Sequence, residues 1–225
     1  MPTKGSGAAT AWQEIDEWEG GIGWIAYPDE DLQRASHALR GEDGLYLVDP
    51  VSFPDIEEFL AEHGEVAGVV LLLDRHKRDA AALANRFEVP VYVPDIMSDV
   101  IRNLDAPVEP IHGELPGTEY VVHTLHNNPF WKEVALYGEN SRTLVVPESV
   151  GTVEFFRTGN ERLGVHPGYR LVPPKKLLRL SPERILVGHG PGIHEDAVAA
   201  LEDALSNSQR RAPQYYVGLA KSMLS

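Results

Sequence analysis

The sequence predicts an α/β protein, a four-layer αββα sandwich in which two sheets pack face to face and helices cover their outer faces. Short runs rich in Ile, Leu, Val and Tyr alternate with stretches of helical period, and each half of the chain begins with strands and ends with a helix. The 225 residues, of which 43% are hydrophobic, are enough to bury such a core. We expect one domain over residues 1–225, with its core at 20–206 and a C-terminal appendage at 207–225, where polarity rises.

The first half of the chain predicts several strands, after which the spacing of the apolar residues changes to that of a helix. Acidic or glycine-containing turns at 29–31 and 41–44 separate the first apolar runs, which indicates an antiparallel meander. After Pro54, Ile56, Phe59 and Leu60 share one helical face. Strand, helix and strand then follow one another, which favours parallel pairing. The predicted strands are 21–27, 34–39, 45–48, 66–73 and 89–93, and the predicted helices are 56–64 and 78–87.

The second half repeats this order. A glycine-containing turn at 138–141 joins two apolar runs and predicts a hairpin. A loop rich in Gly and Pro spans 159–174. The predicted strands are 120–125, 133–137, 142–146 and 185–187, and the predicted helices are 175–180 and 195–205.

Composition restricts the partners and the chemistry. Cysteine is absent, so a metal can be held only by His, Asp or Glu. The 34 acidic and 20 basic residues give a formal net charge of −14, which disfavours nucleic acid as a partner. The bases include few lysines, so the surface is typical either of an ordinary acidic protein or of one from a high-salt cytoplasm.

Localisation follows from the apolar runs. The longest, 66–73, is far shorter than the ~20 residues that cross a bilayer, and the first residues lack the apolar region of an export signal. We therefore expect a cytoplasmic protein with no membrane partner.

Polar side chains follow four of the predicted strands, where the sites of open α/β sheets lie. The segment 74–79 follows the run 66–73, His126 follows 120–125, Glu148 follows 142–146, and His189 lies between two glycines after 185–187. Imidazoles and carboxylates are ligands for Zn, Fe and Mn, and side chains on several strand ends can converge. The sequence therefore predicts a metal site at one edge of the sheets.

These features together resemble the metallo-β-lactamase fold superfamily. The resemblance rests on the order of elements, on the cluster at 74–79, on His-Thr-Leu-His at 123–126, on Glu148 and on Val-Gly-His-Gly-Pro at 187–191, and it covers roughly residues 21–205. Asp49, after an early strand, fits a structural aspartate of that family.

The family's His-x-His-x-Asp-His signature is degenerate here, and only its second histidine, His76, is retained. Arg78 stands where the family has the aspartate, and a guanidinium cannot ligate a cation. The resemblance thus implies at most one divalent ion (Zn, Fe or Mn), or none. The implied metal residues are Asp74, His76 and His126, with Glu148 and His189 at the second position, and the implied catalytic residues are Arg78, as an electrostatic helper, and Asp79.

Structural roles compete with each of these assignments. Asp74 and Asp79 flank a helix start, where aspartate is favoured as a cap, and Glu148 is also consistent with a surface turn. His189 is consistent with a plain linker, and either His123 or His126 can face the site. For His112, His166 and His194 we expect solvated or structural roles, and for His37 a satisfied core position.

The predicted function is metal-dependent hydrolysis of an ester, thioester or amide. The alternative is a metal-free relative that binds a small ligand or a protein through the same groove, and a third is an iron oxidoreductase. The aromatic segment 127–131, with Trp24 and Tyr27, is consistent with a pocket for a small molecule or with the contact of a homodimer. No phosphate loop and no serine nucleophile elbow is present.

Overall fold

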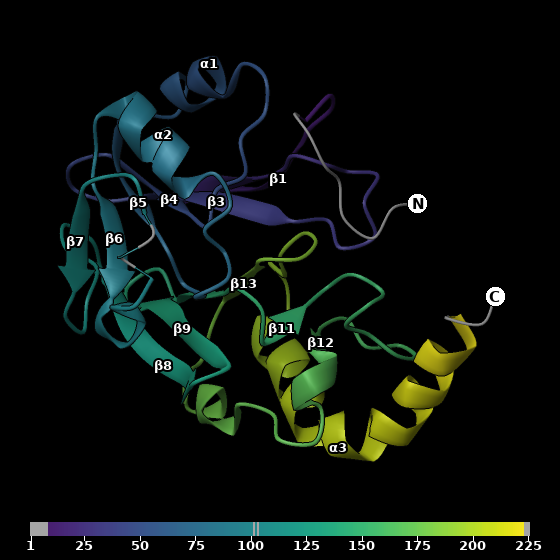
Figure 1. The fold of residues 1–225 in the computed structure, drawn as a ribbon. Coiled ribbons are helices and arrows are strands. Elements are labelled where there is room, and N and C mark those ends of the chain that lie inside the picture. Colours follow the sequence, from purple (N-terminus) through teal and green to yellow (C-terminus); the bar gives the residue numbers. More distant parts are fainter. Residues whose placement is uncertain (1–8, 101, 103, 223–225) are drawn as a thin grey trace.

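A computed structural model describes residues 9–100, 102 and 104–222 of the chain. Its larger sheet has seven strands in sequence order (Figure 1). The pairs from β1 to β4 are antiparallel, and the pairs from β4 to β7 are parallel, as the period change predicts. The strands are β1 (Gln13–Trp18), β2 (Gly21–Ile25), β3 (Ala35–Arg40), β4 (Leu45–Val48), β5 (Val66–Val70), β6 (Val91–Pro94) and β7 (Val108–Ile111).

The second sheet has four strands in the order β13, β10, β9, β8. Only β10 and β13 pair in parallel. A separate two-stranded ladder, β11 with β12, follows β10 in the chain. The strands are β8 (Tyr120–Asn128), β9 (Trp131–Gly138), β10 (Thr143–Val146), β11 (Val150–Gly151), β12 (Gly164–Val165) and β13 (Arg184–Val187).

Helices cover the outer faces of both sheets, which gives the expected four layers (Figure 1). The helices α1 (Ile56–Ala61) and α2 (Ala80–Phe87) lie over the first sheet, and α3 (Ala197–Ser222) lies over the second. The fully described short 3-10 turns are η1 (Asp95–Met97), η3 (Pro167–Tyr169) and η4 (Lys175–Arg179).

Three strands of the second sheet, β9, β10 and β13, contain segments that are apolar on both faces because both faces are covered there. Val134 and Leu136 of β9 belong to the core between the sheets, whereas Ala135 between them packs in the core under α3. The two-residue period of a strand sends neighbouring side chains to opposite faces. This explains why β9, β10 and β13 have runs of apolar residues instead of an alternating pattern.

Several features differ from the sequence-based expectation, including the β11–β12 ladder, which was not predicted. The strands β1 and β7 were not predicted, since both are short and carry exposed acidic residues. The strand expected over 66–73 leaves its sheet after Val70, and Val134 of the other sheet then donates to the carbonyl of Leu72. The last helix continues to Ser222 with Pro213 inside it, and its residues Ala212 and Tyr215 are buried.

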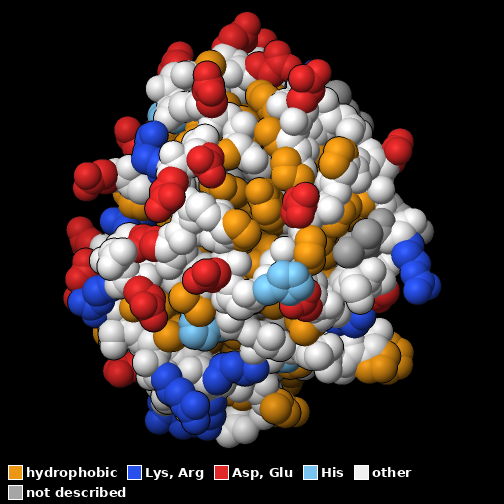
Figure 2. Space-filling view, turned by 90° about the vertical axis from the view of Figure 1, so that its left-hand side faces the viewer, with side chains coloured by type: hydrophobic (Ala, Val, Ile, Leu, Met, Phe, Trp, Pro, Cys, Tyr) orange, Lys and Arg blue, Asp and Glu red, His pale blue; other side chains and the backbone are white. Residues whose placement is uncertain are grey.

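The surface carries the acidic excess. Figure 2 shows the side of the molecule near β6 and β7, where acidic side chains surround an apolar strip and the basic side chains gather mainly at the lower end. Among the described residues, no helix combines the length and the apolar character that a bilayer crossing needs.

Candidate functional site

Three side chains from distant parts of the chain converge at one edge of the two sheets. One ligand atom each of His76, Glu148 and His189 lies within 4.8 Å of the others. Glu148 Oε2 is 3.0 Å from His76 Nε2 and 2.9 Å from His189 Nε2. This is the only such group of three or more potential ligands among the described residues.

Parallel strand pairs bring these residues together. Glu148 and His189 follow β10 and β13, which are paired in parallel, so both side chains emerge at the same edge. The loop of His189 approaches its neighbours so closely that a Cβ atom on Gly188 would lie 2.1 Å from the carbonyl oxygen of Pro147. Gly190 has a φ of +88°, a conformation that disfavours other residues. The glycines around His189 are therefore needed for its placement.

The rings of His76 and His189 are both held in place through Nδ1, the ring nitrogen that faces away from Glu148. His76 Nδ1 is 3.1 Å from Asp49 Oδ2, and the other oxygen of Asp49 accepts from the amide of Leu72. His189 Nδ1 is 2.8 Å from the carbonyl oxygen of Leu32. A carbonyl only accepts, so His189 must carry its proton on Nδ1. The Nε2 atoms of both rings are thus directed at Glu148, the arrangement that usually supports metal-bound histidines.

The carboxylate of Glu148 is ionised. Burial opposes ionisation, but hydrogen bonds from His189 and His76 outweigh it and hold the pKa of Glu148 well below its ordinary value. Its side chain is only 15% exposed, which rules out a plain surface turn. A nearly dry anion between two imidazoles is a strong attractor for a cation.

A second carboxylate, Glu133 of β9, lies behind the site and is fully buried. Its Oε1 accepts from the amides of Glu148 and Ser149, and its Oε2 accepts from the Ser149 hydroxyl and from Trp131 Nε1. Burial raises the pKa of Glu133 to about 7, against these hydrogen bonds, which lower it. Glu133 therefore fixes the backbone from which Glu148 projects.

Arg78 lies at the same edge, where it donates to three backbone carbonyls. Its Nη1 is 2.6 Å from the oxygen of Ala35 and 2.7 Å from that of Asp49, and its Nη2 is 3.2 Å from that of Gly188. Burial lowers the pKa of Arg78, while the nearby carboxylates of Asp49 and Glu148 raise it. The guanidinium thus links the ends of β3, β4 and β13 and places a positive charge near Glu148.

The other sequence-based candidates lie outside the three-residue group. Asp74 Oδ2 accepts from the amide of Lys132 because the chain after β5 crosses to β9. His126 Nε2 is 3.0 Å from Ser149 Oγ, and its ring stacks on Tyr169 at 3.7 Å. Burial lowers the pKa of His126 to about 4.

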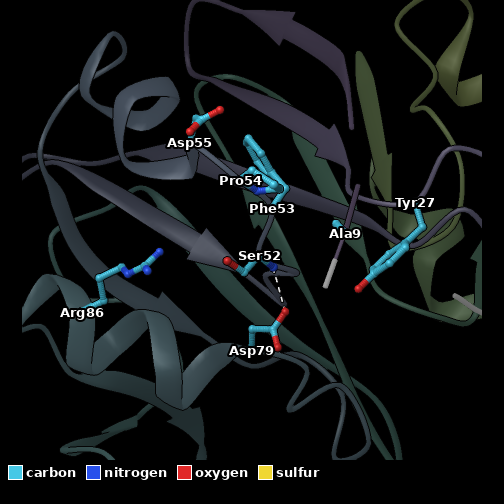
Figure 3. A pocket seen from close by; sticks show the side chains of 8 residues that line it. All are labelled: Ala9, Tyr27, Ser52, Phe53, Pro54, Asp55, Asp79 and Arg86. Atoms are coloured by element: carbon cyan, nitrogen blue, oxygen red, sulfur yellow. Dashed lines mark hydrogen bonds between the residues drawn. The ribbon is translucent and has the colours of Figure 1, made fainter. Parts of the chain in front are cut away.

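Asp79 lies in a neighbouring cavity of about 390 Å³. Its Oδ2 accepts from the amide of Ser52 at 2.8 Å. Figure 3 draws this hydrogen bond as a dashed line. Phe53, Pro54 and Arg86 line the same cavity.

His37 is a satisfied core histidine, as the sequence indicated. Its Nε2 is 3.1 Å from Asp16 Oδ2, and His194 contacts the other oxygen of the same carboxylate. Asp16 also accepts from the amide of Gly192. This cluster fixes the loop that follows His189.

Sequence reasoning missed His166, for which it predicted a solvated or structural role. His166 Nε2 lies 3.5 Å from Glu148 Oε1, and its ring packs edge-on against Trp131 at 4.9 Å. Burial lowers the pKa of His166 to about 4, so the ring is neutral at neutral pH. A histidine before Pro167 in a long loop gives no sequence signal for this location.

The group formed by His76, Glu148 and His189 fits a divalent metal. It supplies two imidazole nitrogens and one carboxylate oxygen, a donor set that suits Zn and also matches the two-histidine, one-carboxylate arrangement of non-haem iron. The outer hydrogen bonds of both rings leave Nε2 free to coordinate once it is deprotonated. Three ligands leave positions open for water or substrate.

Comparison with solved structures identifies the fold as that of the metallo-β-lactamases, which confirms the expected fold class. A metallo-β-lactamase from Pontibacter korlensis has a TM-score of 0.64 at 13% identity and covers 88% of this chain and 100% of that one. The DIM-1 metallo-β-lactamase exposed to ceftazidime has a TM-score of 0.64 at 14% identity and covers 92% and 99%.

A third similar structure is TTHA1623 in a di-iron-bound form. It has a TM-score of 0.55 at 22% identity and covers 75% of this chain and 93% of that one. No protein-family model matches the chain, and no curated protein does. The comparisons therefore establish the fold, and the chemistry has to be argued from the residues of this chain.

Proposed function

We propose that the protein is a mononuclear metal-dependent hydrolase that acts on an ester, thioester or amide. The observation that carries the proposal is the convergence of His76, Glu148 and His189. A hydrogen bond at Nδ1 fixes the orientation of each imidazole. A divalent ion bound there would lower the pKa of a water ligand toward neutrality and polarise a substrate carbonyl. The proposed ligands are three of the five metal residues that the sequence implied, and Asp74 and His126 are not among them.

The chain's own residues provide the positioning. Asp49 and the carbonyl of Leu32 set the two imidazole rings, and Glu133 sets the backbone of Glu148. Side chains fixed in this way bind a metal without first losing conformational freedom.

The positive charge of Arg78 supports one ion instead of two. Its guanidinium already donates to three carbonyls at the sheet edge, and it cannot serve as a ligand. Two unit charges ~4 Å apart repel by about 4 kcal/mol at an effective dielectric of 20. A second divalent cation beside Arg78 would meet at least this repulsion.

Elemental analysis of protein purified without chelator tests the proposal. We expect about one Zn, Fe or Mn per chain. Metal affinity should fall by more than about 100-fold in Glu148→Ala and in His189→Ala, since loss of a residue that only hydrogen-bonds to a ligand already lowers metal affinity about 10- to 100-fold. Asp74→Ala, His126→Ala and the control His123→Ala are expected to keep their metal. His123 lies on β8 against Tyr137, outside the group.

The converse pattern would identify the first implied metal position, formed by Asp74, His76 and His126, as the binding site. Metal lost in Asp74→Ala and His126→Ala but kept in Glu148→Ala would contradict the proposed site. Protein with no metal and unchanged stability would favour the metal-free binding module. This alternative is supported by the hydrogen bonds that Glu148 already makes to His76 and His189.

Hydrolysis is tested with the metal-loaded protein on nitrophenyl esters, thioesters and anilides. We expect turnover of at least one class, and its loss in Glu148→Ala. A loaded protein that is inert toward all three classes but consumes oxygen would instead indicate an iron oxidoreductase, which the donor set also permits.

A further inference from the structure

The imidazole of His166 lies beside the candidate metal group but is built differently from its two histidines. It caps the short turn η3, and its Nδ1 accepts a hydrogen bond from the amide of Gly168 at 3.1 Å. A backbone amide can only donate, so His166 Nδ1 carries no proton. In the neutral ring the proton must therefore be on Nε2, the nitrogen that faces Glu148.

His76 and His189 have the opposite arrangement. Their Nδ1 atoms face acceptors, so their Nε2 lone pairs can be directed at a cation. In His166 the lone pair on Nδ1 is used by Gly168, and Nε2 presents a hydrogen. His166 is thus a donor at this site and not a fourth ligand.

The hydrogen on His166 Nε2 has no strong acceptor among the described residues. Glu148 uses Oε2 for His76 and His189, and its Oε1 is 3.5 Å from His166 Nε2, beyond the usual range of an N–H···O hydrogen bond. The side chain of His166 is 17% exposed, so an incoming molecule can reach it.

The ring is also rigidly placed. The β11–β12 ladder ends next to it, and the amide of His166 donates to the carbonyl of Ser149, one residue after Glu148. Phe156 packs against the ring at 5.6 Å, and Trp131 packs against it at 4.9 Å. A fixed donor with an available hydrogen is suited to stabilising charge that develops during a reaction.

We propose that His166 is a catalytic residue that donates its Nε2 hydrogen to the substrate oxygen on which negative charge develops during hydrolysis. This proposal rests on the proposed function, and it assigns a role to a residue outside the metal ligands. The donor stays neutral, so no proton has to leave the ring for it to act.

The test compares His166→Phe, which keeps the aromatic packing, with His166→Gln, which keeps an N–H donor, and with the control His123→Phe. Co²⁺ is titrated alone, and acetate is then titrated into the Co²⁺-loaded protein while the visible spectrum is followed. We expect Co²⁺ affinity within about threefold of wild type in all variants. Acetate binding should weaken about 3- to 10-fold in His166→Phe, the loss expected for one hydrogen bond, and recover in His166→Gln.

Kinetics give a second measurement on the ester or thioester that wild type hydrolyses. The kcat of His166→Phe should fall about 100-fold with KM within about twofold, because the hydrogen bond strengthens in the transition state. His166→Gln should recover at least part of kcat.

Two results would overturn the role of His166 alone. One is a fall in Co²⁺ affinity of more than about 100-fold in His166→Phe, which would make His166 a ligand. The other is an active, metal-loaded wild type whose acetate affinity and kcat are unchanged in His166→Phe or not recovered in His166→Gln. Wild-type protein that takes up no metal would overturn the proposed function, and this inference with it.

Discussion

At the scale of single residues, the buried carboxyl group of Glu133 in β9 makes the stability of the protein depend on pH. It accepts four hydrogen bonds in a fully buried position, two of them from the backbone that carries Glu148. Burial still dominates and raises its pKa to about 7. The native protein therefore holds a proton there that the unfolded chain releases at lower pH.

This difference predicts a pH dependence of stability. The pKa of Glu133 is higher in the folded than in the unfolded protein. Protonation of Glu133 therefore contributes fully to the free energy of unfolding below the unfolded pKa of about 4.3, and this contribution is lost as pH rises through the folded pKa. Between pH 5.5 and pH 8 the wild type should lose about 2 kcal/mol of unfolding free energy relative to Glu133→Gln. Urea unfolding of both proteins at the two pH values measures this loss.

The matched control is Glu183→Gln, whose side chain is 64% exposed. Its free energy of unfolding should change with pH as that of the wild type does. A wild type that gains stability over Glu133→Gln as pH rises would show that the hydrogen bonds, and not burial, decide the pKa of Glu133.

Single residues also show what the sequence could predict about the site. Glu148 and His189 directly follow buried parallel strands, so their convergence was predictable. Asp74 and His126 also follow predicted strands, but the departure of the chain from β5 and the hydrogen bond to Ser149 depend on tertiary pairing. His166 approaches the site from a loop whose path no local pattern determines.

At the scale of elements, Arg78 adds side-chain hydrogen bonds between β3 and β4 of the first sheet and the residue after β13 of the second. Its hydrogen bonds reach the ends of β3 and β4 and the residue after β13, and the last of these belongs to the loop that carries His189. Its φ of 40° lies in the left-handed region, which is unfavourable for arginine, so the surrounding contacts hold it there.

Arg78→Lys is expected to lower the unfolding free energy by about 2–4 kcal/mol, because one ammonium cannot replace the planar guanidinium and each unsatisfied buried carbonyl costs about 1–3 kcal/mol. Chemical denaturation measures the loss. Arg75→Lys is the control, since the Arg75 side chain is 50% exposed and lies over the Trp131 ring. A loss below about 0.5 kcal/mol, the usual effect of a surface substitution, would contradict this linking role.

Elements were predicted well where apolar period and turn residues agreed. The strands β4, β10 and β13 and the hairpin turn after β9 lie where the pattern placed them, whereas β8 continues three residues beyond its predicted end at Leu125. The full length of α3 was not predictable, because Arg170 and Glu161 from the long loop pack beside its polar C-terminal half. Tertiary contacts there replace the apolar stripe that a helix of this length usually shows.

At the scale of the whole molecule, the net charge of −14 acts on stability through self-repulsion. Raising KCl from 0.1 M to 1 M shortens the Debye length from about 10 Å to about 3 Å. We expect the melting temperature to rise by about 5 °C over this range, which corresponds to roughly 1–2 kcal/mol for a chain of this size. Differential scanning fluorimetry or calorimetry measures the shift.

The same rise is expected in NaCl, because screening depends on ionic strength and not on the cation. A melting temperature that falls or stays constant as salt increases would argue against adaptation to a high-salt cytoplasm.

The placement of the three proposed metal ligands has a consequence for how the protein is made. A nascent chain that has left the ribosome only as far as β11 presents His76 and Glu148, but it lacks His189, which follows β13. Translation arrested before β13 should therefore yield chains that do not retain the ion, whereas released chains of all 225 residues should retain it. An ion bound at the proposed site would therefore be loaded late in biogenesis, after β13 has paired with β10 in the second sheet.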